Sequence, residues 1–327
     1  MVNNAEALIA EGLEHHKAGR QDAAERCYHA AIEADPACAD AWHLLAVLAR
    51  EISMLDVALE LVGQAIELAP DIALFRVTLG DLLRDVKDHE GAEAAYKAAL
   101  DAKPDSFEAM TGLGLLYRSQ NSPGDALPYL VGALALRPRS PEALSNLGVV
   151  LELQGHLDGA IDCYRKALEL APTSLTFLTN LGSALIMRDD FAEGDAILKR
   201  GIELFPDDLD IRLNFARLLR RREKHDEALA VIDQAMADFP GSSELLLERG
   251  MLLIRMERLD EAESALVESG KIHPRPEVSV AMGSVAQLRG DPERAIRMCR
   301  QAIGMKDDYL PAWASLARTF LMVHKMQ

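Results

Sequence analysis

Residues 141–172 read PEALSNLGVVLELQGHLDGAIDCYRKALELAP and hold almost one full period of a repeat that runs through the chain. Proline marks the period most clearly, because eight of the 14 prolines lie 34 residues apart from Pro36 to Pro274. If each of these prolines is numbered position 32, the first repeat begins at Ala5. A fixed period of this length is typical of repeat architectures, in which each unit stacks on the next.

Three columns of small residues follow the same register. Position 8 is Gly or Ala in the first eight repeats, and positions 20 and 27 are nearly always Ala; in the quoted segment these are Gly148, Ala160 and Ala167. Positions 4, 7, 8 and 11 share one face of a helix, and positions 20, 24 and 27 share one face of a second helix after a turn. The small residues predict close approach of the two axes, with a large side chain such as Tyr164 at position 24 beside them.

The register predicts a chain made of helical pairs. The proline ends each second helix, because it lacks an N–H group and disfavours helix in the residue before it. We expect an N-terminal tail at residues 1–4 and a final single helix at residues 310–327. The nine pairs between them are expected at residues 5–38, 39–72, 73–106, 107–140, 141–174, 175–208, 209–242, 243–275 and 276–309.

This pattern resembles the tetratricopeptide repeat family, whose signature places Leu-Gly at positions 7–8, Ala at 20, an aromatic at 24, Ala at 27 and Pro at 32. The match runs from Ala5 to the end of the chain, with local departures such as Glu11 and Arg249 at position 7. The resemblance implies an all-α, right-handed superhelix whose first helices line a concave groove that binds proteins. The carboxylate clamp of the chaperone-binding members is absent, since positions 5 and 9 hold residues such as Ser145 and Val149.

Composition excludes several other classes. The chain has 327 residues, 35 Lys and Arg against 52 Asp and Glu, and a formal charge of −17, which argues against nucleic acid as the main partner. No segment is apolar for long enough to span a bilayer and no secretory signal is visible, so we expect a cytoplasmic protein. No catalytic motif is present, and we expect neither an enzyme nor a cofactor.

The four cysteines show no zinc or disulfide pattern, so we interpret them as reduced thiols, mostly in the core. We expect no metal site, because His15 and His16 have no nearby cysteine or acidic ligand set.

Asparagine recurs at position 6 of three successive repeats, as Asn146, Asn180 and Asn214, although the chain has only six asparagines. Position 6 points away from the packing face of the first helix, toward the groove. A row of amides there can bond both the N–H and the C=O groups of an extended peptide. The alternative is that each asparagine bonds a neighbouring helix or faces water.

Arginine recurs at position 12, as Arg50, Arg84, Arg118 and Arg220, and Arg217 and Arg221 occupy positions 9 and 13 beside the last of these. An arginine row can meet carboxylates bidentately. The alternative is ion pairing with surface carboxylates such as Glu51, Asp85 and Asp81, which contributes only about 0–1 kcal/mol per exposed pair. Since the two rows lie about 120° apart around the helix, we expect them to border opposite sides of one groove.

Two functions from different classes fit these features. Residues 12–49 and the later NLG motifs resemble the N-terminal superhelix of bacterial proteins similar to O-linked N-acetylglucosamine transferase, including flagellin-modifying transferases. That resemblance implies a module that recruits a protein or peptide for a glycosyltransferase.

The alternative function is a scaffold that associates with a second copy through its last helix. That helix carries Trp313, Leu316, Phe320, Leu321, Met322, Val323 and Met326 and is too apolar for a solvated cap, so we expect a continuing chain, a second copy or a partner to cover it.

Overall fold

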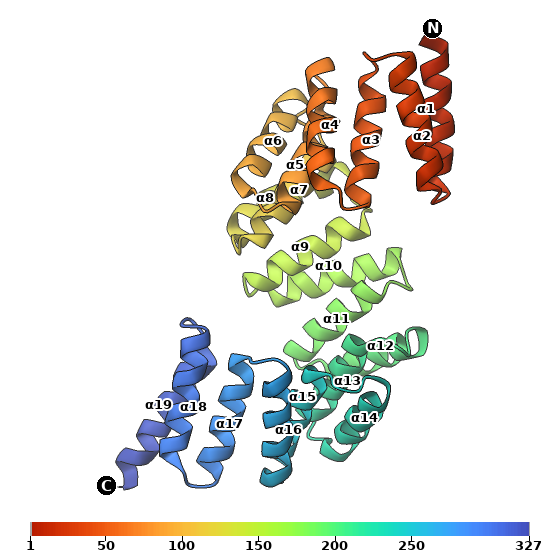
Figure 1. The fold of residues 1–327 in the computed structure, drawn as a ribbon. Helices are drawn as coiled ribbons and strands as arrows, with labels where there is room; N and C mark the ends of the chain where they lie inside the picture. Colours follow the sequence, from red (N-terminus) through yellow and green to blue (C-terminus); the bar gives the residue numbers. More distant parts are fainter. Residues whose placement is uncertain (1, 327) are drawn as a thin grey trace. The chain divides into compact units, whose positions relative to one another are not determined.

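The computed structural model describes residues 2–326, and within them the chain forms 19 α-helices and no β-strand (Figure 1). The predicted all-α fold is confirmed. In chain order the helices are α1 (Val2–Lys17), α2 (Gln21–Ala34), α3 (Ala39–Glu51), α4 (Leu55–Leu68), α5 (Ala73–Asp85), α6 (His89–Ala102), α7 (Phe107–Ser119), α8 (Pro123–Leu136), α9 (Pro141–Leu153), α10 (Leu157–Leu170), α11 (Leu175–Met187), α12 (Phe191–Leu204), α13 (Leu209–Arg221), α14 (His225–Asp238), α15 (Ser243–Arg255), α16 (Leu259–Ile272), α17 (Pro276–Leu288), α18 (Pro292–Met305) and α19 (Leu310–Met326).

The helices follow the 34-residue register closely. From α3 onward every odd-numbered helix begins at the first residue of an expected repeat, and its even-numbered partner follows after three residues. The start of the chain differs from expectation, because α1 begins at Val2. Residues 2–4 are therefore helical and the predicted tail is wrong for them, since no proline precedes Ala5 to delay the helix. Met1 and Gln327 lie outside the described residues.

Proline stands two residues beyond the end of every second helix from α2 to α16, as expected. Helix α2 stops at Ala34, and the next residue, Asp35, takes an extended conformation with φ −146° and ψ 93° immediately before Pro36. Lys103 does the same before Pro104, with φ −143° and ψ 92°. The proline ring excludes the helical conformation from the residue before it, which turns the chain toward the next repeat.

Close contact between position 8 and position 24 joins the two helices of a pair. A Cβ atom added at Gly148 would lie 2.5 Å from the ring of Tyr164, and one added at Gly80 would lie 2.7 Å from the ring of Tyr96. Both tyrosines are almost completely buried. The glycine thus makes the space that the aromatic ring fills, and the buried alanines at positions 20 and 27 keep the rest of the interface thin.

Each turn from a first helix to its second helix has three residues, and the middle one is left-handed. At position 15 the backbone φ is positive in every repeat, and only three of these residues are glycine, the type that adopts this conformation without strain. The residues are Gly19, Ser53, Lys87, Asn121, Gly155, Asp189, Glu223, Glu257 and Gly290.

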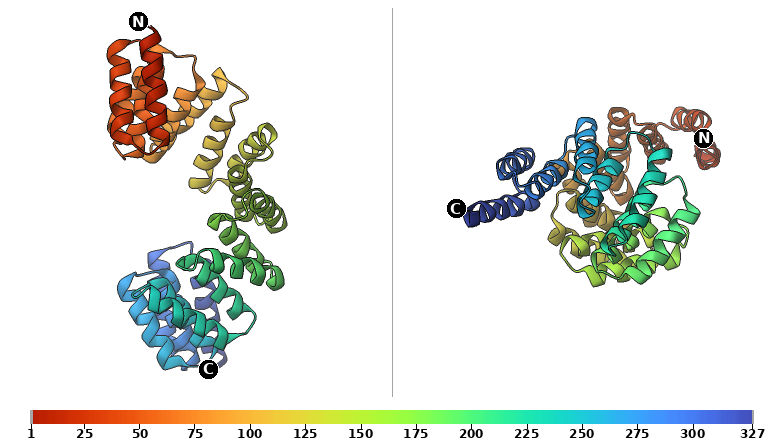
Figure 2. Two further views of the ribbon diagram at one scale, coloured as in Figure 1. Left: turned by 90° about the vertical axis from the view of Figure 1, so that its right-hand side faces the viewer. Right: turned by 90° about the horizontal axis from the view of Figure 1, so that it is seen from below.

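The helices form two compact units, Met1–Ala171 and Pro172–Gln327, which Figure 2 shows from two further directions. In the first unit, consecutive first helices contact each other from α3 to α9, and in the second they do so from α11 to α19. No contact of similar extent joins consecutive second helices within the described residues. The first helices therefore lie on the inner side of each unit, where the family resemblance implies a groove.

The last helix, α19, packs on α17 and α18 and leaves apolar side chains outside. Leu310 is 77% exposed and Leu321 is 64% exposed, and Trp313, Phe320 and Met322 are also exposed. Leu316 is buried and Val323 is half-buried, whereas the side chain of Met326 lies outside the described residues. Among residues 2–326, no helix combines the length and the apolar character that crossing a membrane requires.

The contact at position 8 predicts opposite effects for two glycine substitutions in the first unit. Gly148→Ala places a methyl group against Tyr164, so we expect it to lower the free energy of unfolding by about 1–3 kcal/mol. Gly63→Ala in α4 meets no atom within 4 Å, and we expect it to raise stability by about 0.5–1 kcal/mol because alanine favours helix. Urea unfolding followed by circular dichroism measures both, and equal shifts would contradict the packing described.

Candidate functional site

The arginine at position 12 of the second repeat is tied to the next first helix. Arg50 Nε donates to Asp85 Oδ2 at 2.6 Å, and Arg50 Nη1 donates to Asp81 Oδ2 at 3.1 Å. Asp81 and Asp85 occupy positions 9 and 13 of the third repeat. The guanidinium group of Arg50 is therefore engaged in ion pairs with the next repeat, as the alternative interpretation of the arginine row predicts.

The same partners are missing for the next two arginines of the row. Positions 9 and 13 of the fourth repeat, which follow Arg84, hold Leu115 and Ser119, and those of the fifth repeat hold no acid either. Arg84 Nη2 lies 3.5 Å from Asp81 Oδ1, and Arg84 Nη1 is buried without a hydrogen-bond partner. Arg118 forms no ion pair within the described part of the chain, and its Nη1 donates to Asn146 Oδ1 at 2.9 Å. Two guanidinium groups thus keep positive charge that no carboxylate fully balances.

These two arginines line an open hollow at the ends of α5 and α7. Its volume is about 520 Å³, and its lining residues are Arg84, Asp85, Lys87, His89, Leu115, Arg118 and Ser119, which together we name the α5–α7 hollow. Lys87 is the left-handed residue of the turn between α5 and α6, and His89 begins α6. The hollow therefore collects basic side chains from two first helices and the intervening turn.

The electrostatics of the hollow favour an anion. Burial lowers the pKa of Arg118, and the nearby positive charge of Arg84 lowers it further. The carboxylate of Asp85 already accepts a hydrogen bond from Arg50, so only part of its negative charge offsets the positive charges of the hollow. His89 Nδ1 is buried and, like Arg84 Nη1, has no partner. Because an unpaired buried donor is costly, Arg84 Nη1 would be stabilised by an acceptor such as a carboxylate.

The asparagines of position 6 divide between the two units and serve the chain's own contacts. Asn146 in the first unit accepts from Arg118, and Asn214 in the second unit is buried and accepts from Arg217 Nη1 at 3.1 Å. Asn180, in the second unit, also interacts with neighbouring groups. The expectation that the two rows border opposite sides of a groove is wrong for Arg118 and Asn146, because position 12 of one repeat reaches position 6 of the next.

The arginines of the seventh repeat also bond within the second unit. Arg217 Nε donates to Glu248 Oε1 at 2.5 Å, and Arg220 Nη2 lies 3.4 Å from Glu248 Oε2. Glu248 is 4% exposed and occupies position 6 of the eighth repeat. Arg221 pairs with Asp189 at 2.7 Å and donates to the backbone oxygen of Ile186. These side chains tie successive repeats together, as Arg50 does.

Comparison with known proteins agrees with this architecture. Two models described as tetratricopeptide repeat match the chain, the first over residues 9–71, 50–107, 77–130, 111–174 and 179–243, and the second over residues 219–283. The chain belongs to the tetratricopeptide repeat family. No curated protein sequence matches it significantly.

Solved structures of tetratricopeptide proteins share the fold at low sequence identity. A tetratricopeptide repeat protein from Parabacteroides merdae aligns with a TM-score of 0.71 at 20% identity, over 76% of this chain and 98% of its own. The Cut9–Hcn1 hetero-tetramer of the APC/C aligns with a TM-score of 0.59 at 14% identity, over 96% and 76%. PilF of Pseudomonas aeruginosa aligns with a TM-score of 0.54 at 20% identity, over 68% and 98%.

Family membership fixes the general class of function. Tetratricopeptide repeats make a protein-interaction or scaffold module, and the repeat fold indicates a non-enzymatic part. The α5–α7 hollow is one part of the described first-helix surface where basic side chains keep donors that the chain does not pair.

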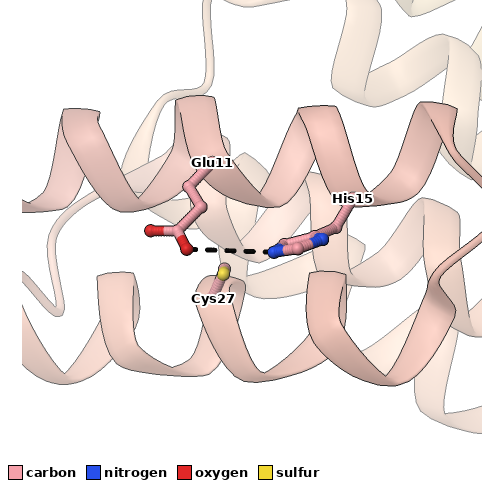
Figure 3. A group of neighbouring side chains, drawn as sticks. All are labelled: Glu11, His15 and Cys27. Atoms are coloured by element: carbon pink, nitrogen blue, oxygen red, sulfur yellow. Dashed lines mark ion pairs between the residues drawn. The ribbon is translucent and has the colours of Figure 1, made fainter.

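The sequence analysis missed one group of side chains. Glu11 and His15 on α1 lie beside Cys27 on α2, with one ligand atom of each within 4.8 Å of the others (Figure 3). The expectation that His15 has no cysteine or acid near it is wrong, because pairing of the two helices brings Cys27 across. The signal was present in the register, where Glu11 and His15 replace apolar residues at positions 7 and 11. Of the four cysteines, all free, Cys163 and Cys299 are buried, whereas Cys27 and Cys38 are only partly so.

The buried carboxylate of Glu248 predicts a large effect on stability. Glu248→Ala removes the partner of both Arg217 and Arg220, and breaking a buried ion pair costs about 3–5 kcal/mol. Arg217 is 42% exposed and water can solvate it, so we expect the lower end of that range. Thermal unfolding by circular dichroism measures the loss. Glu268→Ala at an exposed site of α16 serves as the control, and a similar shift in both variants would contradict this role for Glu248.

Proposed function

We propose that the first unit binds an extended acidic segment of a partner protein, with one carboxylate held in the α5–α7 hollow. The observation that carries this proposal is the pair of arginines, Arg84 and Arg118, which line one hollow and whose positive charge no carboxylate fully balances. A flexible acidic segment suits a surface lined by successive first helices, because it can follow them and place one side chain in the hollow.

A carboxylate fits the donors better than other small groups. Guanidinium presents a planar fork of N–H donors that matches the two oxygens of a carboxylate, and such charge-assisted bonds are stronger than neutral ones. Lys87 adds a third positive charge at the rim. The net charge of −17 opposes an acidic ligand only at short range, since repulsion between exposed charges is screened over about 8 Å at physiological ionic strength.

The remaining predicted residues take supporting roles in this proposal. Asn146 holds Arg118 by accepting one of its N–H groups, which leaves other donors of the guanidinium for the ligand. Arg50 bonds Asp81 and Asp85 and so offsets part of the negative charge that Asp85 brings to the lining of the hollow. In the second unit we propose that Asn180, Asn214, Arg217, Arg220 and Arg221 shape the first-helix surface that a longer partner would follow.

An acidic peptide tests the proposal directly. A fluorescent peptide of alternating Asp and Ala should bind the full chain, and the same peptide with Asn in place of Asp should not. Arg84→Gln and Arg118→Gln should each weaken binding at least about tenfold, because each removes a charge-assisted pair of about 1.5–3 kcal/mol. Fluorescence anisotropy gives the dissociation constants, and added salt should weaken binding.

Arg139→Gln is the matched control, since it removes the same charge from an exposed turn between α8 and α9. It should bind the acidic peptide as the unsubstituted protein does. Equal binding of the Asp and Asn peptides, or equal weakening by Arg139→Gln and Arg118→Gln, would overturn the proposal.

A finer proposal concerns the larger process. We propose that the module recruits acceptor proteins for a cytoplasmic glycosyltransferase, supported by the resemblance of residues 12–49 to the repeat superhelix of such enzymes. Proteins retained from a native lysate by this chain, and lost with Arg84→Gln, should then carry O-linked N-acetylglucosamine in mass spectra. Unmodified captured proteins would contradict the recruitment role and leave peptide binding intact.

Self-association through α19 is a second candidate function. The supporting observation is the exposed apolar surface of Leu310, Trp313, Phe320, Leu321 and Met322, which a second copy of the same helix could cover. We expect light scattering to give a dimer mass that Leu310→Ser with Leu321→Ser reduces to a monomer. Leu153→Ser, at a similarly exposed site of α9, should leave the mass unchanged. A monomer at all concentrations would exclude this function.

A further inference from the structure

The first helical pair brings three potential metal ligands to one place. Gly12 lies so close to Tyr28 that an added Cβ would be 2.5 Å from its ring, and the same approach brings the Cβ of Cys27 to 3.1 Å of that point. Glu11 and His15 are one turn apart on α1, so they share the face that looks toward Cys27. Figure 3 shows the three side chains converging between the two helices.

The register shows how unusual this arrangement is within the chain. Glu11, His15 and Cys27 occupy positions 7, 11 and 23 of the first repeat. In the fourth repeat the same positions are Leu113, Tyr117 and Tyr129, which belong to one apolar cluster with the two tyrosine rings stacked 5.7 Å apart. The first repeat therefore places a carboxylate, an imidazole and a thiol where the fold packs apolar side chains.

We propose that Glu11, His15 and Cys27 bind a zinc ion and leave its fourth position to water. Carboxylate oxygen, imidazole nitrogen and thiolate sulfur are the three donor types that Zn²⁺ takes in proteins, at about 2.0–2.3 Å. Since only one of the three ligands is sulfur, ligand atoms around a tetrahedral ion are then about 3.3–3.6 Å apart. His15 Nε2 already lies 3.8 Å from Glu11 Oε1, and all three donor atoms lie within 4.8 Å. The side chain of Glu11 is 63% exposed and is free to close the remaining distance.

Two features of the site oppose binding of the ion, the positive charge of Arg20 and the raised pKa of the Cys27 thiol, and the first of them can be tested by substitution. Arg20 Nε donates to His15 Nδ1 at 2.8 Å, which places a positive charge beside the site and favours the proton on Nε2. Arg20 is exposed, so binding requires only that it swing into solvent. Burial raises the pKa of the Cys27 thiol, and the Glu11 carboxylate raises it further. A bound cation reverses that effect, because metal coordination deprotonates a thiol.

His16 is not part of the set. Its Nδ1 lies 3.2 Å from the hydroxyl of Tyr28, and its Nε2 lies 2.8 Å from Glu51 Oε2 in the next repeat. Its two nitrogens are therefore both engaged, and it ties α1 to its neighbours while His15 faces Cys27.

The experiment titrates the full, untagged chain with Co²⁺ as a spectroscopic probe and then with Zn²⁺ as competitor. We expect one Co²⁺ per chain, a thiolate-to-metal charge-transfer band, and loss of the band on addition of Zn²⁺. Cys27→Ser should abolish the band, and Glu11→Gln should weaken binding at least about tenfold. Cys38→Ser is the matched control, since Cys38 is also partly exposed and lies outside the cluster; it should leave the spectrum unchanged.

Arg20→Gln separates a built site from adventitious binding. It removes the opposing charge and the hydrogen bond to His15, so we expect Zn²⁺ to bind severalfold more tightly, which a structural role for Arg20 would not produce. Zn²⁺ should also raise the unfolding midpoint of the chain and of Cys38→Ser, but not that of Cys27→Ser. A band that survives Cys27→Ser, the absence of any band, or an affinity unaffected by Arg20→Gln would overturn the proposal.

Discussion

The contact between position 8 and position 24 governs the rest of this molecule. In the first eight repeats, where position 8 is glycine, the facing tyrosine or leucine lies directly against the backbone of the first helix, as Tyr96 lies against Gly80. That contact fixes how close the two helices come and which of their faces point outward. The first-helix residues left over are then free to bond the next repeat or a ligand. The direction of the side chains in both proposed sites depends on this contact. Arg84 and Arg118 stand at position 12 of a first helix, and Glu11 and His15 stand at positions 7 and 11.

The arginine row shows how one residue type takes two roles on a regular scaffold. For Arg50, Arg118 and Arg220, the side chain at position 12 reaches position 6, 9 or 13 of the following first helix. Where an acid stands there, as Asp81 and Asp85 do for Arg50, the arginine ties the repeats together. Where Leu115 and Ser119 stand instead, Arg84 keeps a donor without an acceptor. The proposed ligand site thus arises because Leu115 and Ser119 replace the acidic partners of the arginine, and it requires no additional sequence motif.

The fold could be predicted nearly completely from the sequence, because the same residue types recur at positions 8, 20, 27 and 32 in repeat after repeat. The helices begin and end where proline, glycine and the apolar face require, apart from the start of α1. The arginines were found for the same reason, and Arg50 does pair with Asp81 and Asp85, which were named as possible partners. The partners Asn146 and Glu248 were not found, since a contact across 28 or 31 residues depends on how one repeat sits on the next. The cluster of Glu11, His15 and Cys27 escaped because its members lie on two helices, so that Glu11 was noted only as a departure from the register.

The two kinds of connection in this chain have different tolerance of length. Every turn inside a repeat has three residues with a left-handed residue in the middle, and none varies. The connection between repeats does vary, from four residues at 239–242 to three at 273–275, and the helices on either side keep their register. An engineer who wishes to graft a reporter, shorten the array or join it to another domain should therefore cut between repeats, where the fold has already absorbed a deletion.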